Sequence, residues 1–210
     1  MIRKNWKLLV ITSVVILLPI LAGLMLWNQL PQQMPSHWNA EGQVDGWSSK
    51  AFSVFGMPLI LLAFQWLCVV ATSADPKKEN HPGKILQLVF WIIPVLSAVL
   101  HVAIYAAALN KQVRMEVVMP VLIGLLFVII GNYLPKCKQN YTIGIKIPWT
   151  LSSEENWNRT HRFSGRLWVV CGLVIMLTGF FGGFWIFFAI VLLMAAAPFI
   201  YSYALHRKGI

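Results

Sequence analysis

The sequence predicts an all-α membrane protein with six transmembrane helices, and three observations lead to this fold class. Hydrophobic residues make up 58% of the 210 residues and charged residues only 11%, whereas charged residues form about a quarter of an average soluble domain. The apolar residues gather in segments close to the roughly 20 that a helix needs to cross the hydrocarbon core. Short polar loops separate these segments, so we expect a single membrane domain over residues 1–210.

Six apolar segments are expected to span the membrane. Only two glycines separate the fifth span from the sixth, which predicts a tight hairpin of helices there. The expected spans are 7–27, 51–72, 86–109, 117–133, 167–181 and 184–205.

The distribution of positive charge predicts the orientation of these spans, because Lys and Arg near span ends stay on the cytoplasmic side. With the N-terminus inside, all of the 17 Lys and Arg residues except Lys50, Lys111 and Arg114 fall in cytoplasmic segments. Both termini are therefore expected in the cytoplasm. The net charge of +10 is then explained by topology and by attraction to anionic membrane lipids, so no direct nucleic-acid partner is expected.

The sequence predicts neither a cofactor nor a bound metal. Cys68, Cys137 and Cys171 are scattered, with no paired spacing typical of a disulfide framework or a zinc site. Ionisable residues are almost absent from the expected spans, and His101 is the exception. An intramembrane histidine is a functional candidate, but its place near the outer face favours a structural role with a neighbouring hydrogen-bond partner.

Residues 28–50 form a polar loop between the first two spans, which we call the outer loop. Its composition predicts a small hairpin or compact loop, with Gly42 at a positive φ angle. We interpret His37, Trp38, Asn39, Gly42 and Asp45 as the residues that would face a ligand from outside the cell. The alternative is an interfacial loop that Trp38 and Trp47 anchor at the level of the headgroups.

A metal site in the outer loop is a further alternative. His37, Glu41 and Asp45 are four residues apart, which would place them on one face of a helix. Gly42 and Gly46 disfavour a helix in this segment, so the sequence does not favour the metal site.

Residues 131–166 form the longest polar segment, which we call the inner loop and expect in the cytoplasm. Ser152 and Glu155 have the spacing of a capping box, which predicts a short interfacial amphipathic helix before the fifth span. At 100° per residue, Glu155 shares one face with the arginines; Trp157 and His161 lie on the opposite face. The arginines of the first face are Arg159, Arg162 and Arg166.

The first half of the inner loop alternates branched residues over 141–150, which is compatible with a short extended segment. No phosphate-binding glycine loop, nucleophile elbow or zinc-protease helix is present in the sequence. Glu154, Glu155 and His161 could serve as acid and base, but no nucleophile is adjacent to them. We therefore expect a protein that is not an enzyme.

Both polar loops resemble known families. The outer loop is similar to a pattern in a bacterial membrane domain of unknown function, and the inner loop resembles the signature of the SdpI family of immunity proteins. The outer pattern falls on Leu30, Pro31, Pro35, His37, Trp38, Asn39, Gly42 and Asp45. The inner pattern falls on Gly131, Asn132, Leu134, Pro135, Lys138, Asn140, Gly144, Lys146, Pro148, Trp149, Thr150, Leu151, Trp157, Thr160, His161 and Gly165.

This resemblance implies a multi-pass protein of the bacterial plasma membrane that protects a cell from a secreted peptide toxin. It also implies a second role in some relatives, which hold an ArsR-type repressor at the membrane once toxin is engaged. From topology we expect toxin contact at the outer loop and repressor or lipid contact at the inner loop. The inner contact residues are expected to be Asn132, Pro135, Asn140, Gly144, Lys146, Pro148, Trp149, Thr150, Glu155, Trp157, Arg159, His161, Arg162 and Arg166.

Two other functions remain open from the sequence. One is a small membrane transporter or a membrane-embedded enzyme that acts on peptide or lipid, with His161 and the glutamates as its chemistry. Such a protein needs a polar cavity that reaches the middle of the membrane, and few polar residues are available to line one. The other is an envelope-stress protein that only modifies the bilayer.

Overall fold

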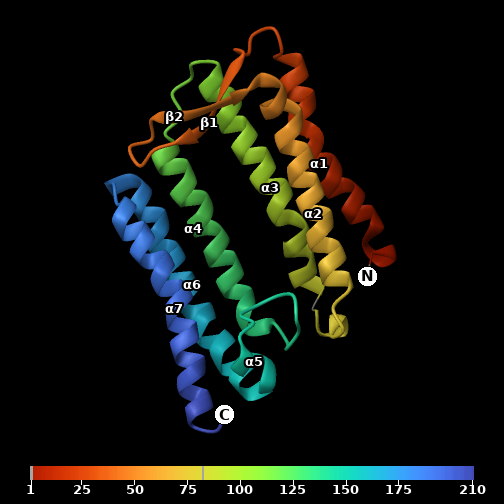
Figure 1. Ribbon diagram of the computed structural model, residues 1–210, viewed down its shortest axis with the longest axis vertical. Coiled ribbons are helices and arrows are strands. Elements are labelled where there is room, and N and C mark those ends of the chain that lie inside the picture. Colours follow the sequence, from red (N-terminus) through yellow and green to blue (C-terminus); the bar gives the residue numbers. More distant parts are fainter. Residues whose placement is uncertain (1, 82) are drawn as a thin grey trace. The chain divides into compact units, whose positions relative to one another are not determined.

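The computed structural model describes residues 2–81 and 83–210. The elements are η1 (Arg3–Asn5), α1 (Trp6–Met25), β1 (Gln33–Trp38), β2 (Val44–Ser49), η2 (Phe52–Gly56), α2 (Met57–Ser73), η3 (Lys78–Asn80), α3 (Gly83–Ala108), α4 (Met115–Tyr133), η4 (Leu134–Lys136), α5 (Pro148–Ser152), α6 (Glu154–Phe181) and α7 (Phe184–Arg207) (Figure 1).

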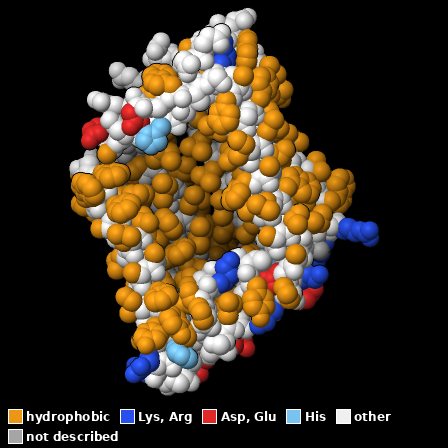
Figure 2. Space-filling model, viewed as in Figure 1, with side chains coloured by type: hydrophobic (Ala, Val, Ile, Leu, Met, Phe, Trp, Pro, Cys, Tyr) orange, Lys and Arg blue, Asp and Glu red, His pale blue; other side chains and the backbone are white. Residues whose placement is uncertain are grey.

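Within the residues that the structure describes, six helical segments are long and apolar enough to cross a membrane, which confirms the predicted all-α, six-span class. They run over Arg3–Met25, Phe52–Ser73, Gly83–Ala108, Met115–Lys136, Glu154–Phe181 and Phe184–Arg207. On the face shown in Figure 2, hydrophobic side chains cover the lengths of the helices, and Lys and Arg side chains lie mainly in the lower half of the view, with further blue atoms at its top. Exposed apolar side chains of this kind suit contact with lipid tails.

The contacts divide the chain into two compact units. Unit 1 comprises the chain up to Ser73 together with Gln87–Met115, and unit 2 comprises Ala74–Leu86 together with Glu116–Ile210. The outer loop lies wholly in unit 1 and the inner loop wholly in unit 2.

Unit 1 packs α1, α2 and α3 through a few buried polar contacts among apolar side chains. The Gln65 amide donates to the Thr12 hydroxyl over 2.8 Å, and the Ser97 hydroxyl donates to the carbonyl of Ile16. His101 is buried, lies 2.7 Å from the carbonyl of Ser97 through Nδ1, and packs edge-on against Tyr105. These contacts favour the structural interpretation of His101.

The outer loop of unit 1 forms the predicted hairpin. Strands β1 and β2 pair antiparallel from Gln33 opposite Ser49 to Trp38 opposite Val44, and Gly42 has a φ angle of 77° in the turn. The hairpin rests on a buried cluster at the end of the helices, which consists of Leu30, Met34, Val54, Ile104, Tyr105 and Ala108.

In unit 2, glycines allow α4 and α6 to approach closely. A Cβ atom on Gly124 would lie 2.5 Å from the carbonyl oxygen of Gly172, and one on Gly131 would lie 2.8 Å from that of Gly165. Small residues at such crossings let helix backbones meet in a membrane, where packing rather than water exclusion drives association. The seven-residue spacing within each helix keeps both pairs on the same faces.

Three expectations for the inner loop need correction. The amphipathic segment before the fifth span is helical, but it is the beginning of the continuous helix α6 rather than a separate helix. Its N-cap is Ser153, whose hydroxyl accepts the backbone N–H of Asn156, and not Ser152. The extended segment considered for 141–150 does not form, because residues 137–147 have bends and irregular backbone and Pro148 begins the short helix α5.

Candidate functional site

The turn region of the inner loop, residues 137–147, is built around the buried side chain of Asn140. Its Oδ1 accepts the backbone N–H groups of Thr142 and Ile143 at 2.9 and 2.7 Å. Its Nδ2 donates to the carbonyls of Lys138 and Ile143 at 2.8 and 2.9 Å. The side chain thereby satisfies backbone groups that a helix or sheet would otherwise pair, which gives the loop a fixed shape.

Asp75, from the connector between α2 and α3, binds the same turn. Its Oδ2 accepts the N–H of Tyr141 at 2.9 Å and the hydroxyl of Thr142 at 2.7 Å, and its Oδ1 accepts the N–H of Lys77. His81 Nε2 lies 3.3 Å from the same carboxylate, and both side chains are almost fully buried.

The electrostatic surroundings keep Asp75 ionised. Burial by itself raises the pKa of a carboxyl group, but hydrogen bonds from Thr142, Lys77 and Tyr141 and the proximity of His81 outweigh it, so the pKa of Asp75 lies below its ordinary value of 3.8. A buried carboxylate with several donors is a strong anchor, because removal of it leaves those donors unpaired.

Gln139 links the connector to α5. Its Nε2 donates to the carbonyls of Thr150 and Leu151, and its Oε1 accepts from the Lys77 ammonium at 2.6 Å. The carbonyl of Gln139 accepts the Asn80 amide at 2.7 Å. Segments separated by some 60 residues in the sequence are thus joined into one polar layer of unit 2.

Trp157 and His161, on the first turns of α6, close the inner loop from the other side. The indole N–H of Trp157 donates to the carbonyl of Cys137 at 2.7 Å. The Trp157 and His161 rings stack with centroids 4.0 Å apart. His161 Nε2 accepts the N–H of Ile145 at 3.0 Å, so Nδ1 carries the proton and donates to the carbonyl of Trp157. Burial raises the pKa of the Cys137 thiol to about 11.

Gly144 is required by this arrangement. Its φ angle is 116°, a conformation that L side chains rarely adopt, and a Cβ atom there would lie 2.5 Å from His161 Nε2. Any side chain at this position would displace the imidazole or the loop.

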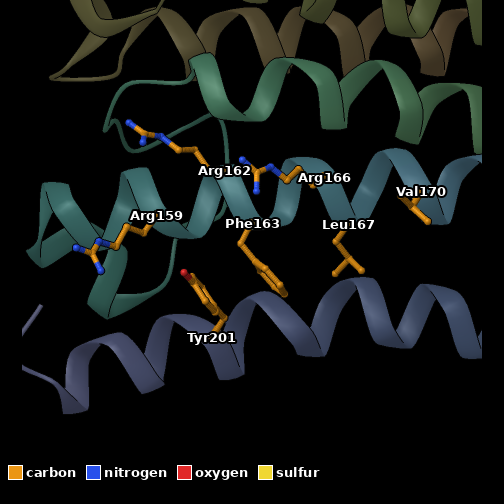
Figure 3. Close-up of a pocket in the computed structure, with 7 residues that line it drawn as sticks. All are labelled: Arg159, Arg162, Phe163, Arg166, Leu167, Val170 and Tyr201. Atoms are coloured by element: carbon orange, nitrogen blue, oxygen red, sulfur yellow. The ribbon is translucent and has the colours of Figure 1, made fainter.

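The beginning of α6 also carries the predicted row of arginines. Arg159, Arg162 and Arg166 are exposed, whereas Trp157 and His161 are buried, as the helical pattern predicted. Arg159 pairs with Glu155 at 2.6 Å. The arginines border an open groove of about 540 Å³. Its lining, shown in Figure 3, is Arg159, Arg162, Phe163, Arg166, Leu167, Val170 and Tyr201.

The outer loop presents polar side chains from a backbone-paired hairpin. His37 Nδ1 contacts the Asp45 carboxylate across the strands, and their side chains are 71% and 44% exposed. The side-chain oxygen of Asn39, Oδ1, accepts the backbone N–H groups of Glu41 and Gln43, which shapes the turn. The spacing that suggested a helical metal face does not apply here, because the segment is a hairpin.

The two tryptophans of the hairpin differ in exposure. Trp38 is partly buried and packs against the cluster below the hairpin, while Trp47 is 58% exposed. Lys50, at the end of the hairpin, is buried; its ammonium donates to the carbonyl of Trp27 and lies over the Trp27 ring.

The structure sorts the predicted inner residues into two groups. Asn140, Thr150, Trp157 and His161 are buried and shape the loop, so their side chains are not free to contact a partner. Trp149 packs against aromatic rings of α7. The exposed residues are Asn132, Pro135, Lys146, Pro148, Glu155, Arg159, Arg162 and Arg166.

Several residues that hold the inner loop and its neighbouring helices in place were not predicted from the sequence. Asp75, His81 and Gln139 are among them, and so is Asn156, which is buried and hydrogen-bonded to Ser202 of α7. One signal was available: the polar connector that contains Asp75 and His81 lies between two apolar spans, and acidic residues are few in this chain. Among residues 2–81 and 83–210, no group of three or more His, Cys, Asp or Glu side chains could hold a metal ion.

Comparisons with known proteins agree with this architecture. The model of the SdpI/YfhL protein family matches residues 136–202, and that of a domain of unknown function (DUF1648) matches residues 14–62. The chain is 26% identical over 195 residues to the immunity protein SdpI of Bacillus subtilis (strain 168), covering 93% of this chain and 90% of that protein. No solved structure matches it. With six spans and these matches, the chain is a multi-pass protein of the bacterial plasma membrane that is similar to the SdpI/YfhL family over residues 136–202.

Proposed function

We propose that this protein is an immunity protein that protects a bacterial cell from a secreted peptide toxin acting on the membrane. The observation that carries the proposal is the similarity to the immunity protein SdpI, which extends over 93% of the chain and includes both polar loops. The positive charges support an orientation with both termini and the inner loop in the cytoplasm. Three spans, α2 to α4, lie between the two polar loops along the chain. Because an odd number of crossings places the two loops on opposite sides of the membrane, the outer loop then faces the exterior.

The outer loop is the proposed site of contact with the toxin. A hydrophobic peptide that approaches from outside would meet Trp47 and the exposed pair of His37 and Asp45 before it could insert. Apolar burial on the exposed ring of Trp47 would supply affinity, and the polar pair would supply selectivity.

Protection without turnover is supported by the state of the side chains that could act in catalysis. Both ring nitrogens of His161 are hydrogen-bonded to the backbone, and the ring is buried. Within the spans of unit 1, the Gln65 amide donates to the Thr12 hydroxyl, and the Ser97 hydroxyl and His101 Nδ1 contact backbone carbonyls. Neither arrangement favours a transporter or a membrane-embedded enzyme.

A finer proposal concerns an ArsR-type repressor, which the inner loop would hold at the membrane. The support is a folded loop that leaves Tyr141 and Lys146 exposed on its surface. Substitution of both residues should release a membrane-bound repressor into the soluble fraction while leaving survival unchanged. A repressor that stays soluble beside the toxin-engaged, unsubstituted protein would contradict this part.

The test of immunity is survival in the presence of toxin. A strain that lacks the gene should lose viability and membrane potential when grown with toxin-producing sibling cells, and expression of the gene should restore both. Unchanged survival of the deletion strain would contradict the proposal. Protection that extends to a chemically unrelated membrane-active peptide would indicate a general effect on the bilayer instead.

A further inference from the structure

The arginine row on α6 contains two positive charges that no acidic group neutralises. Arg159 is paired with Glu155, whereas Arg162 and Arg166 have neither an ion pair nor a hydrogen bond within residues 2–81 and 83–210. They lie four residues apart, so they share one face of the helix. In Figure 3 both guanidinium groups extend along the same side of α6. Together they place two neighbouring positive charges on an exposed surface.

Apolar side chains continue from this positive site along the helix. Phe163 and Leu167 extend toward α7, where Tyr201 stacks on Phe163 with ring centroids 4.4 Å apart (Figure 3). Val170 follows one turn further into the span and is 60% exposed. The groove of about 540 Å³ therefore has its cationic side chains over the turns from Arg159 to Arg166, interleaved with Phe163, and its far end is apolar, at Leu167 and Val170.

The place of this groove in the chain sets its depth in the membrane. The apolar part of α6 begins at Leu167, so the arginines fall at the level of the headgroups and the apolar side chains face the acyl region. Glu154 and Glu155 border a neighbouring groove together with Asn158, Arg159 and Arg162, so the glutamate end of the helix is less favourable for an anion than the side at Arg166. Arg162 and Arg166 are then the groups that an anion would meet.

We propose that this groove binds an anionic phospholipid. Its phosphate would lie on Arg162 and Arg166, and an acyl chain would run along Phe163, Leu167 and Val170. Guanidinium groups recognise phosphate oxygens through paired N–H donors. An anionic lipid matches both ends of the groove at once, whereas an acidic protein surface would leave the apolar end uncovered. The site would fix the beginning of α6, and with it the inner loop, to the cytoplasmic leaflet.

Lipid retention by the purified full-length protein tests the proposal. The protein is exposed to equal amounts of phosphatidylglycerol and phosphatidylethanolamine in mixed micelles, and the retained lipids are counted by native mass spectrometry. We expect preferential retention of phosphatidylglycerol. The double variant Arg162→Gln/Arg166→Gln should bind it about 30-fold more weakly, which corresponds to about 2 kcal/mol for the two charges. The matched control Arg207→Gln removes an exposed charge of the same unit away from the groove and should change nothing.

Two further measurements separate the possible occupants. Soluble glycerol 3-phosphate at the same concentration should not displace the lipid, because it lacks the acyl chain; displacement would contradict the apolar part of the site. Equal retention of the two lipids by the unsubstituted protein would overturn the proposal. So would a double variant that retains phosphatidylglycerol normally but loses a bound cytoplasmic protein, since the row would then be a protein-binding surface. Thermal unfolding confirms that the variants fold.

Discussion

The outer and inner loops of this protein are ordered by different forces. The outer loop is a hairpin held by backbone pairing, and its polar pair of His37 and Asp45 lies on the surface. The inner loop has no strand in residues 137–147, and buried side chains of Asp75, Asn140 and His161 bind its backbone instead. The polar pair of the hairpin is therefore free for recognition, whereas the buried polar residues of the inner loop are committed to its shape.

Substitution of Gly144 should produce the largest effect. Gly144→Ala forces an L residue into a φ angle of 116° and places its Cβ against His161, which breaks the bond from Ile145. We expect the free energy of unfolding to fall by about 3 kcal/mol, the sum of backbone strain and a lost buried hydrogen bond. Thermal or denaturant unfolding in detergent measures the change.

Gly182→Ala is the matched control for this substitution. Gly182 also has a positive φ angle, 66°, but nothing lies within 4 Å of a Cβ atom there. It should cost only the conformational part, about 1 kcal/mol. Equal destabilisation by the two variants would show that contact with the stacked His161 ring adds nothing to the cost of a side chain at position 144.

Asp75→Asn should produce the next largest effect. The substitution removes the negative charge and places an amide beside donors from Lys77, Tyr141 and Thr142. A loss of about 2 kcal/mol is expected, because buried donors are left unpaired. Opening of the loop should also expose Cys137, so its alkylation should become faster than in the unsubstituted protein, where the thiol is buried. An unchanged rate of alkylation would contradict the anchoring role of Asp75.

The pH dependence of this difference tests whether Asp75 stabilises the loop as a carboxylate. Because the pKa of Asp75 in the folded protein lies below 3.8, its ionised form contributes stability that is fully present above that value and is lost as the pH falls through the folded pKa. The difference in unfolding midpoint between the unsubstituted protein and Asp75→Asn should therefore be constant from pH 7 to about 5 and shrink below pH 3.8. A difference that vanishes near pH 6 would contradict this assignment.

Asp45→Asn, in the outer loop, should have the smallest effect on stability. Exposed ion pairs contribute about 0–1 kcal/mol, and the strands remain paired through their backbones. The same variant should lower protection from toxin, because the proposed contact is lost. A large loss of stability in this variant would show that the hairpin depends on its polar pair, and the contrast between the two loops would disappear.

The parts of the structure that depend on local pattern could be predicted from the sequence. Apolar length gave the six spans, turn residues gave the hairpin around Gly42, and helical periodicity separated Trp157 and His161 from the arginines. Asp75 and Gln139 could not be assigned in this way, because their partners lie some 10 to 70 residues away and only the fold brings them together. The cap at Ser153 instead of Ser152 is a shift of one residue, which spacing alone does not resolve.

Sidedness is the property on which the functional assignment of both loops depends. Single substitutions Glu41→Cys in the hairpin turn and Lys146→Cys in the inner loop place thiols on exposed positions, and the unsubstituted protein gives the background from its three native cysteines. A membrane-impermeant maleimide applied to intact cells should label position 41 at once and position 146 only after the cells are permeabilised. Labelling of both positions in intact cells, or of neither, would contradict a protein that meets its toxin with one loop and the cytoplasm with the other.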